Sequence, residues 1–150
     1  MLGDHEKQKD LLIRALEIYE KHYNKNHPET AAVLAHFGNA WNKLGQPTKA
    51  KDLLLRAFDI NMECFGEKHP SALSILDYIG DAFRLLNDSE SSKSYLTLSL
   101  QINESSYGKN HPSSGFTLMR LGEVYFGLQD YGTALDYITR ANQVFLSTFW

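Results

Sequence analysis

Hydrophobic residues recur along this chain at intervals of three and four positions, which is the period of an amphipathic α-helix. The stripe in residues 29–44 consists of Leu34, Phe37, Trp41 and Leu44, and the stripe in residues 47–65 consists of Leu53, Leu54, Ala57, Phe58 and Ile60. Pro28 precedes the first stripe, where a missing backbone N–H is tolerated. Gly66 follows the second stripe, where glycine permits a left-handed turn. The pattern therefore predicts two consecutive helices.

The same pair of helices is predicted twice more, because the pattern repeats every 42 residues. The dipeptide His-Pro marks each repeat, at His27-Pro28, His69-Pro70 and His111-Pro112. Its surroundings repeat with it: Leu34, Leu76 and Leu118 share one position, Phe37, Ile79 and Leu121 a second, Trp41, Phe83 and Tyr125 a third, and Leu12, Leu54, Leu96 and Ile138 a fourth. We therefore expect first helices at 29–44, 71–86 and 113–128, and second helices at 47–65, 89–107 and 131–147. An unpaired second helix is expected at 5–23, after a turn at 2–4.

Glycine occupies one position of every first helix, as Gly38, Gly80 and Gly122. Glycine lowers the stability of a helix by about 1 kcal/mol relative to alanine, so its recurrence needs a reason. We expect these glycines to let two helices approach closely. Ala50 and Ala134 in the second helices are interpreted in the same way.

The repeats predict one continuous array rather than separate domains. Its parts are an incomplete repeat at 1–26 and three repeats at 27–68, 69–110 and 111–150. Asn24 stands where Gly66 and Gly108 end the other second helices. The last helix carries the apolar residues Ile138, Val144, Phe145, Phe149 and Trp150. Because solenoid ends normally carry polar faces, we expect either a segment of a longer array or ends that associate with further copies.

This pattern resembles the tetratricopeptide repeat. The residues that carry the resemblance are Leu34, Phe37, Gly38, Trp41, Ala50, Leu54 and Ala57. The second repeat departs from the family pattern, with Ser92 and Ser99 in place of alanines and Asn87 in place of glycine, and Met62 stands where the family usually has proline. A 42-residue unit with Gly-x-x-His-Pro is similar to the repeats of kinesin light chains. The resemblance implies an all-α fold, a right-handed superhelix of antiparallel helix pairs.

The resemblance also implies a concave groove, lined by positions of the first helices that lie between their core positions. The predicted groove residues are His36, Asn39, Lys43, Asp77, Tyr78, Asp81, Arg84, Phe116, Met119, Arg120, Glu123 and Phe126. These positions differ between repeats, either because they are solvent-facing and free to vary or because they recognise a ligand. Phe116, Met119, Phe126 and Tyr78 are expected either to anchor a ligand or to be covered by a helix outside this chain. His36, Tyr78 and Arg120 replace asparagines that are common in the kinesin light chain groove.

The composition narrows the class of partner. The chain has 150 residues and a formal net charge of −3, and the predicted groove holds three basic and three acidic residues. Nucleic acid is therefore not an expected partner, since phosphate binding usually needs a basic surface. No apolar run approaches the roughly 18 residues of a membrane span, and the first residues do not form a secretory signal. With a single cysteine, these features predict a cytoplasmic protein.

No catalytic or metal-binding arrangement is recognisable. His27, His69 and His111 recur once per repeat, too far apart to bind one metal, so we expect each of them to cap or flank a helix start. Cys64 is interpreted as a small packed residue rather than a nucleophile. Catalytic motifs such as Gly-x-Ser-x-Gly are absent from the sequence, so we expect neither an enzyme nor a cofactor.

Three hypotheses follow. The first is a scaffold whose groove binds a peptide or short helical segment of a partner protein. The second is a structural element that forms homo-oligomers through its terminal helices, residues 5–23 and 131–150. The third and least favoured is an enzyme, which would need a deep pocket with paired, strongly perturbed acid and base groups.

Overall fold

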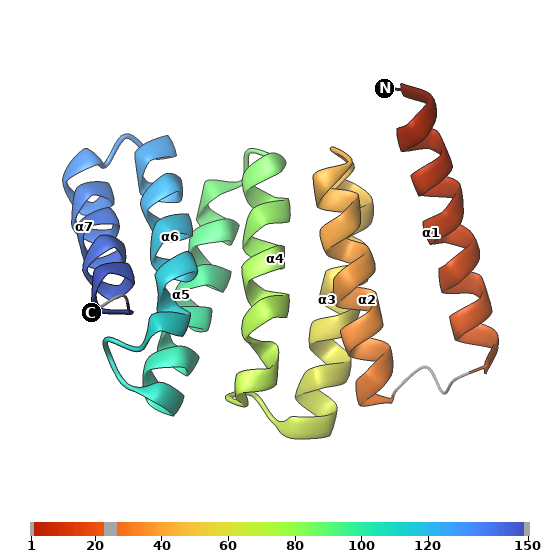
Figure 1. Cartoon of the computed structure of the whole chain (residues 1–150), viewed down its shortest axis with the longest axis horizontal. Coiled ribbons are helices and arrows are strands. Elements are labelled where there is room, and N and C mark those ends of the chain that lie inside the picture. Colours follow the sequence, from red (N-terminus) through yellow and green to blue (C-terminus); the bar gives the residue numbers. More distant parts are fainter. Residues whose placement is uncertain (1, 23–26, 149–150) are drawn as a thin grey trace.

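The structure is a computed structural model that describes residues 2–22 and 27–148, with side chains from residue 6 onward, and this part of the chain contains helices and no strand (Figure 1). The α-helices are α1 (Leu2–His22), α2 (Pro28–Lys43), α3 (Pro47–Phe65), α4 (Leu73–Leu85), α5 (Ser89–Tyr107), α6 (Gly115–Gly127) and α7 (Tyr131–Thr148). Two short 3-10 helices, η1 (Pro70–Ala72) and η2 (Pro112–Ser114), precede α4 and α6. The prediction of an all-α, right-handed superhelix is confirmed.

The helices form consecutive pairs, α2 with α3, α4 with α5 and α6 with α7, that stand side by side along the array (Figure 1). The first helices α2, α4 and α6 lie next to one another on one face, which we call the inner face, and α3, α5 and α7 lie behind them. The buried residues Leu34, Leu54, Leu76, Leu96 and Leu118 run through all three pairs. These positions belong to two hydrophobic clusters, one centred on α2, α3 and α4 and the other on α6 and α7, and α5 contributes Ile102 to the first and Leu96 to the second.

Most predicted boundaries agree with the structure, and two predictions are wrong. Helices α3 and α5 have the predicted bounds, and the other paired helices differ from prediction by one to three residues. The predicted turn at 2–4 does not exist, because α1 is already helical from Leu2. The helices predicted at 71–86 and 113–128 begin with the 3-10 turns η1 and η2, and only then continue as the α-helices α4 and α6. Residue 23, Asn24, Phe149 and Trp150 lie outside the described residues.

The His-Pro motif both caps a first helix and attaches it to the preceding repeat. Gly66 ends α3 with a φ of 90°, as predicted for glycine after a helix. The Nδ1 atom of His69 accepts a hydrogen bond from the backbone N–H of Ser71 at 3.1 Å, and its ring stacks on Phe65 with centroids 4.7 Å apart. The Ser71 hydroxyl donates to Oδ1 of Asn61 in α3 at 3.0 Å. The expected capping role of the histidines is thus confirmed, and His27 and His111 cap in the same way.

We expect His69→Ala to lower the free energy of unfolding by about 1 kcal/mol, the usual cost of losing an N-cap acceptor. The variant loses the acceptor for the Ser71 N–H and the ring that stacks on Phe65. His69→Asn restores an acceptor and should recover part of the loss. Urea unfolding of the three proteins measures this. Equal stability of His69→Ala and the original chain would show that the cap contributes nothing.

The recurring glycines do allow close approach, as predicted. A Cβ atom at Gly80 would lie 2.6 Å from both Cγ and Cδ2 of Leu96, and a Cβ at Gly122 would lie 2.6 Å from Cγ1 of Ile138. Leu54 occupies the equivalent place against Gly38. In each pair, a large side chain of the second helix therefore packs directly against the glycine of the first helix, in space that any other residue would fill with its Cβ atom.

Candidate functional site

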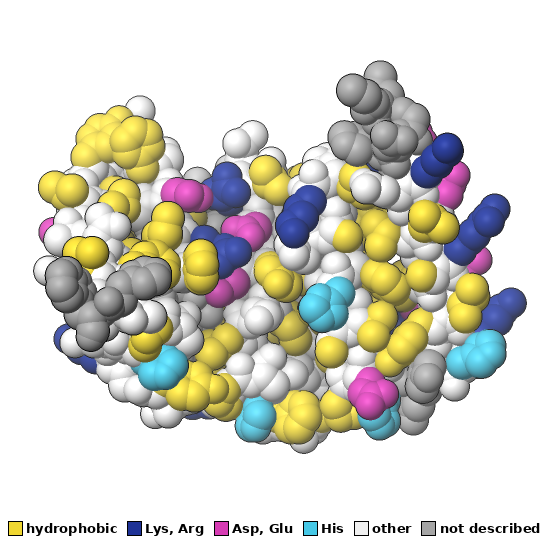
Figure 2. All heavy atoms as spheres, viewed as in Figure 1, with side chains coloured by type: hydrophobic (Ala, Val, Ile, Leu, Met, Phe, Trp, Pro, Cys, Tyr) yellow, Lys and Arg dark blue, Asp and Glu magenta, His cyan; other side chains and the backbone are white. Residues whose placement is uncertain are grey.

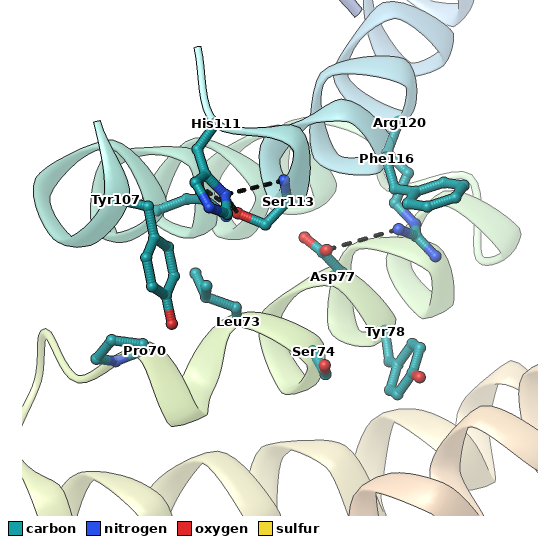
Figure 3. Close-up of a pocket in the computed structure, with 11 residues that line it drawn as sticks. Pro70, Leu73, Ser74, Asp77, Tyr78, Tyr107, His111, Ser113, Phe116 and Arg120 are labelled. Atoms are coloured by element: carbon teal, nitrogen blue, oxygen red, sulfur yellow. Dashed lines mark hydrogen bonds and ion pairs between the residues drawn. The ribbon is translucent and has the colours of Figure 1, made fainter. Parts of the chain in front are cut away.

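The inner face contains a pocket of about 660 Å³ between α4 and α6, which we call the α4–α6 pocket (Figure 3). Its lining residues are Pro70, Leu73, Ser74, Asp77, Tyr78, Asn103, Tyr107, His111, Ser113, Phe116 and Arg120. Four of the predicted groove residues meet here, Asp77 and Tyr78 from α4 and Phe116 and Arg120 from α6. Tyr78 and Arg120 occupy the same position of successive repeats. The pocket is thus walled largely by aromatic and apolar side chains, which suits an apolar side chain of a ligand.

Phe116 is the most exposed aromatic residue of this pocket, with 64% of its surface accessible. Its ring packs edge-to-face against Phe145 of α7, with centroids 5.3 Å apart. Phe145 fits there because residue 115 is glycine: a Cβ at Gly115 would lie 2.6 Å from Cζ of Phe145. Packing against Phe145 of α7 therefore holds the Phe116 ring in its exposed position.

Phe145 is a residue whose role the sequence analysis missed, because it was assigned to an unfinished end. A signal was present, since Gly115 replaces Leu73 of the previous repeat and Phe145 replaces Asn103. From the second repeat to the third, the first of these positions loses a large side chain and the second gains one. The two positions are in contact in the structure. Val144, which was assigned to the same end, is also buried within its own repeat.

An equivalent pocket of about 400 Å³ lies one repeat earlier, between α2 and α4. Its lining includes Ala32, Ala35, His36 and Phe65, and it shares Ser74 and Tyr78 with the α4–α6 pocket. Tyr78 therefore stands between two neighbouring pockets. His36 is exposed at the rim of the earlier pocket, as the groove prediction requires.

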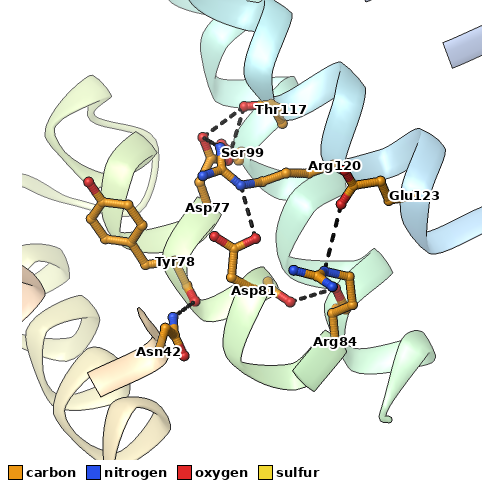
Figure 4. Close-up of polar contacts among 11 residues, drawn as sticks. Asn42, Asp77, Tyr78, Asp81, Arg84, Ser99, Thr117, Arg120 and Glu123 are labelled. Atoms are coloured by element: carbon orange, nitrogen blue, oxygen red, sulfur yellow. Dashed lines mark hydrogen bonds and ion pairs between the residues drawn. The ribbon is translucent and has the colours of Figure 1, made fainter. Parts of the chain in front are cut away.

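Two of the predicted groove residues, Asp77 and Asp81, are engaged by the protein itself (Figure 4). Ser99 and Thr117 donate hydrogen bonds to the Asp77 carboxylate at 2.8 and 2.9 Å. Nη1 of Arg120 lies 3.5 Å from Oδ2 of Asp77, and its Nε donates to Oδ1 of Asp81 at 3.0 Å. These contacts join the second and third repeats, so we assign both aspartates to holding the inner face together.

Burial raises the pKa of Asp77 above its ordinary value, although the charge of Arg120 and the hydrogen bonds of Ser99 and Thr117 oppose the shift. Burial lowers the pKa of Arg120, but the charge and hydrogen bond of Asp81 together with the charge of Asp77 outweigh it, so the pKa is raised overall. This network accounts for Ser99, one of the two serines that replace alanine in the second repeat. The other, Ser92, donates to the backbone oxygen of Gly80 at 2.7 Å.

A polar cleft of about 420 Å³ lies beside this network, between α2 and α4. Asn39, Lys43 and Arg84 line it together with Asn42, whose Nδ2 donates to the backbone oxygen of Tyr78 at 3.1 Å. Lys43 is exposed, and Arg84 has only a long ion pair with Glu123, at 3.8 Å. Figure 2 shows these charges of both signs gathered over the middle of the inner face. Lys43 and Arg84 can therefore contact a ligand without breaking the core of the network.

The remaining predicted groove residues, Met119 and Phe126, lie on α6 and do not line the α4–α6 pocket. Met119 is exposed, and Phe126 is exposed with its ring edge-to-face against Tyr131 at 5.1 Å. Phe126 borders a separate polar cleft with Glu123 and Arg84. The structure thus divides the twelve predicted residues among several neighbouring sites on one face rather than a single cavity.

Within the described ranges no group of three or more His, Cys, Asp or Glu side chains could hold a metal ion. Cys64 is exposed, so its interpretation as a packed residue is wrong. None of the helices in the described part of the chain is long and apolar enough to cross a bilayer.

The fold and the inner face define a helical-repeat protein of the solenoid class. The family model for the tetratricopeptide repeat matches residues 1–60 and 38–105. The chain belongs to the tetratricopeptide repeat family, whose members generally act as protein–protein interaction scaffolds. No curated protein matches this chain at the level of its sequence.

Solved structures of kinesin-light-chain-like proteins share the fold. BtubC (BKLC) from P. vanneervenii matches 97% of this chain and 58% of its own length, with a TM-score of 0.82 and 18% identity. A putative kinesin light chain from Podosopora anserina with nearly identical TPR-like repeats matches with a TM-score of 0.78 and 20% identity, over 97% of this chain and 69% of its own. A variant of the latter protein gives a TM-score of 0.81. The chain thus spans little more than half of BtubC, and the resemblance to kinesin-light-chain-like repeats is confirmed.

Proposed function

We propose that this chain is a protein-interaction scaffold, and that its inner face binds a peptide or a short helical segment of a partner protein. The observation that carries the proposal is the exposed ring of Phe116 beside the α4–α6 pocket. A large apolar side chain that a second aromatic ring holds exposed to solvent, beside a concavity, is typical of an anchor for a partner.

The neighbouring sites suggest how a ligand would be held. Apolar side chains of the ligand enter the α4–α6 pocket and the pocket before it, on either side of Tyr78. Lys43, Arg84, Asn39 and His36 are placed to hydrogen-bond its backbone or acidic groups. The balanced charges of this face favour recognition by contact rather than long-range electrostatic attraction.

We expect the double variant Phe116→Ala, Met119→Ala to weaken ligand binding at least tenfold while leaving the melting temperature nearly unchanged. Both side chains are exposed, so their truncation removes contact area for a ligand but little of the core. Binders selected from a displayed peptide library against the original chain provide the ligand, and their affinities for both proteins are compared.

A matched control is Leu135→Ala, which truncates an equally exposed apolar residue on α7. It should leave the affinity for the same peptides unchanged. If the double variant loses thermal stability as well as binding, Phe116 and Met119 are part of the core and are not ligand contacts. Equal affinity of the double variant and the original chain would remove the inner face as the binding site.

We further propose that the chain is cytoplasmic, catalyses no reaction and needs no cofactor. The general role of the family as a protein–protein interaction scaffold supports this. Self-association through the terminal helices is the second candidate function. The exposed apolar residues Ile18 on α1 and Leu146 on α7 favour it. A mass that increases with concentration in light scattering would support it.

A further inference from the structure

The two apolar pockets of the inner face repeat the same arrangement, one repeat apart. We call the earlier one, of about 400 Å³, the α2–α4 pocket. Nine of its eleven lining residues have their equivalents, 42 positions later, in the lining of the α4–α6 pocket. Pro28 and Pro70 occupy one such position, and Phe65 and Tyr107 occupy another. A ligand that fits one pocket can therefore present a second, similar side chain to the other.

A stacked pair of aromatic rings stands beside each pocket and fixes one of its walls. Phe65 stacks on His69 with centroids 4.7 Å apart, and Tyr107 stacks on His111 with centroids 4.9 Å apart (Figure 3). Both histidine rings are held in place because they also cap the next helix. Phe65 and Tyr107 nevertheless remain 45% and 48% exposed. Each pocket therefore has an apolar wall that is ordered before a ligand arrives, which lowers the entropy cost of binding.

The packing of the first helices sets the distance between the two pockets. Helix α2 contacts α4, and α4 contacts α6. The axes of helices in contact lie about 8–10 Å apart. Because equivalent residues line the two pockets, we take the distance between them to be this same spacing of about 8–10 Å. Tyr78 lines both pockets, so its side chain stands between them.

Of the regular backbone conformations, polyproline II fits this spacing best. Its side chains three positions apart point the same way and lie about 9 Å apart, and the two side chains between them point elsewhere. Side chains on one face of a β-strand lie about 7 Å or about 13 Å apart, so the spacing does not match. Residues seven positions apart in an α-helix lie about 10.5 Å apart, but the residues three and four positions along lie between them on the same face. Those residues would collide with Tyr78.

We propose that the inner face binds a polyproline II segment of a partner protein, with apolar side chains three positions apart in the α2–α4 and α4–α6 pockets. The proposal rests on the proposed function of the inner face and specifies the ligand. Arg120 and Asp77 lie 3.5 Å apart and neutralise each other, so the α4–α6 pocket does not require a charged group. Among the residues that the structure describes, neither the Tyr78 nor the Tyr107 hydroxyl has a hydrogen-bond partner. Both can donate to the backbone carbonyls of polyproline II, which form no internal hydrogen bonds.

A second copy of this chain does not supply such a segment. The sequence contains four prolines, and each of them is the first residue of a helix. Residues 1–150 therefore hold no proline-rich stretch. The ligand that the pockets fit has a different sequence pattern, with proline between apolar residues that recur at every third position.

The test measures by calorimetry the affinity of the full chain for synthetic, end-blocked peptides made of proline and two leucines. The leucines are three positions apart in one peptide, and two or four positions apart in two controls of the same composition. The first peptide should bind about tenfold more tightly than either control, because only it buries both leucines. An alanine-rich helical peptide with leucines seven positions apart should also bind more weakly. This comparison uses the original chain and needs no variant.

Variants of the two aromatic walls show whether both pockets are filled together. Phe65→Ala and Tyr107→Ala should each weaken binding of the first peptide about tenfold. Each should weaken the controls by no more than about twofold, because a ligand that fills one pocket can move to the other. Tyr131→Ala is the matched control, since it truncates an exposed aromatic residue of α7 that lines neither pocket. It should leave every affinity unchanged, and thermal unfolding confirms that each variant is folded.

A preference for the spacing of three that both wall variants remove supports the proposal. Equal affinity for the three proline peptides overturns it, and tighter binding of the helical peptide would assign the face to a helix instead. Binding that strengthens as the protein is diluted would mean that a second copy occupies the face, which also overturns the proposal. If library-selected peptides still depend on Phe116 in these cases, the inner face remains a binding site and only the polyproline II ligand is wrong. If no peptide of either kind binds, the proposed function fails as well.

Discussion

Replacing Gly80 with leucine should destabilise the chain by more than about 3 kcal/mol, and even alanine should cost about 1–2 kcal/mol. The first added carbon would lie 2.6 Å from two atoms of Leu96, which is 1% exposed and cannot move into solvent. Alanine gains up to about 1 kcal/mol of helix propensity over glycine, which offsets only part of the overpacking. Urea unfolding followed by circular dichroism measures both losses.

A second substitution tests whether the collision with Leu96 is the cause. In a double-mutant cycle, Leu96→Ala should make Gly80→Ala less costly, with a coupling of about 1–2 kcal/mol. Gly132→Ala is the matched control, because no atom lies within 4 Å of a Cβ at that position of α7. It should be neutral or slightly stabilising. A loss at Gly132 as large as that at Gly80 would mean that the close approach is not what requires glycine.

The fold could be predicted because its determinants are local and repeated. Helix α3 begins at Pro47 and ends before Gly66. Proline at a helix start and glycine after a helix end can both be recognised in a single sequence. The start of α1 could not be predicted in the same way. The turn expected at 2–4 connects two helices in the complete repeats, but here the same residues are part of α1. A boundary that depends on a tertiary contact has no signal of its own in the residues beside it.

The inner face was only partly predictable for a related reason. The family resemblance implies which positions face the groove, such as those of Tyr78 and Phe116, but not which of these side chains the protein uses itself. Asp77 was predicted to face a ligand, yet it turns toward Ser99 and Thr117, which lie 22 and 40 residues away in sequence. Phe145 supports Phe116 across a similar separation. Such pairs become visible only when the repeats are placed side by side.

Arg120 is expected to be the most important charge of the inner face. Arg120→Met keeps much of the apolar stem but leaves Asp77 and Asp81 without their cation, and we expect a loss of about 3 kcal/mol at neutral pH. The aspartates retain only 14% and 18% of their side-chain exposure, so water cannot fully replace the guanidinium. Arg84→Met is the matched control: its ion pair with Glu123 is long and exposed, and its loss should stay below about 0.5 kcal/mol.

The cost of Arg120→Met should also depend on pH. Burial already raises the pKa of Asp77, and removing Arg120 takes away the largest influence that opposes the rise. Between the ordinary and the raised pKa the folded state binds more protons than the unfolded state, so stability falls as pH rises through that window. Acidification from neutral pH into the window should therefore reduce the loss caused by Arg120→Met, as should adding Asp77→Asn. A loss that is independent of pH and unaffected by Asp77→Asn would mean that Arg120 acts through packing alone.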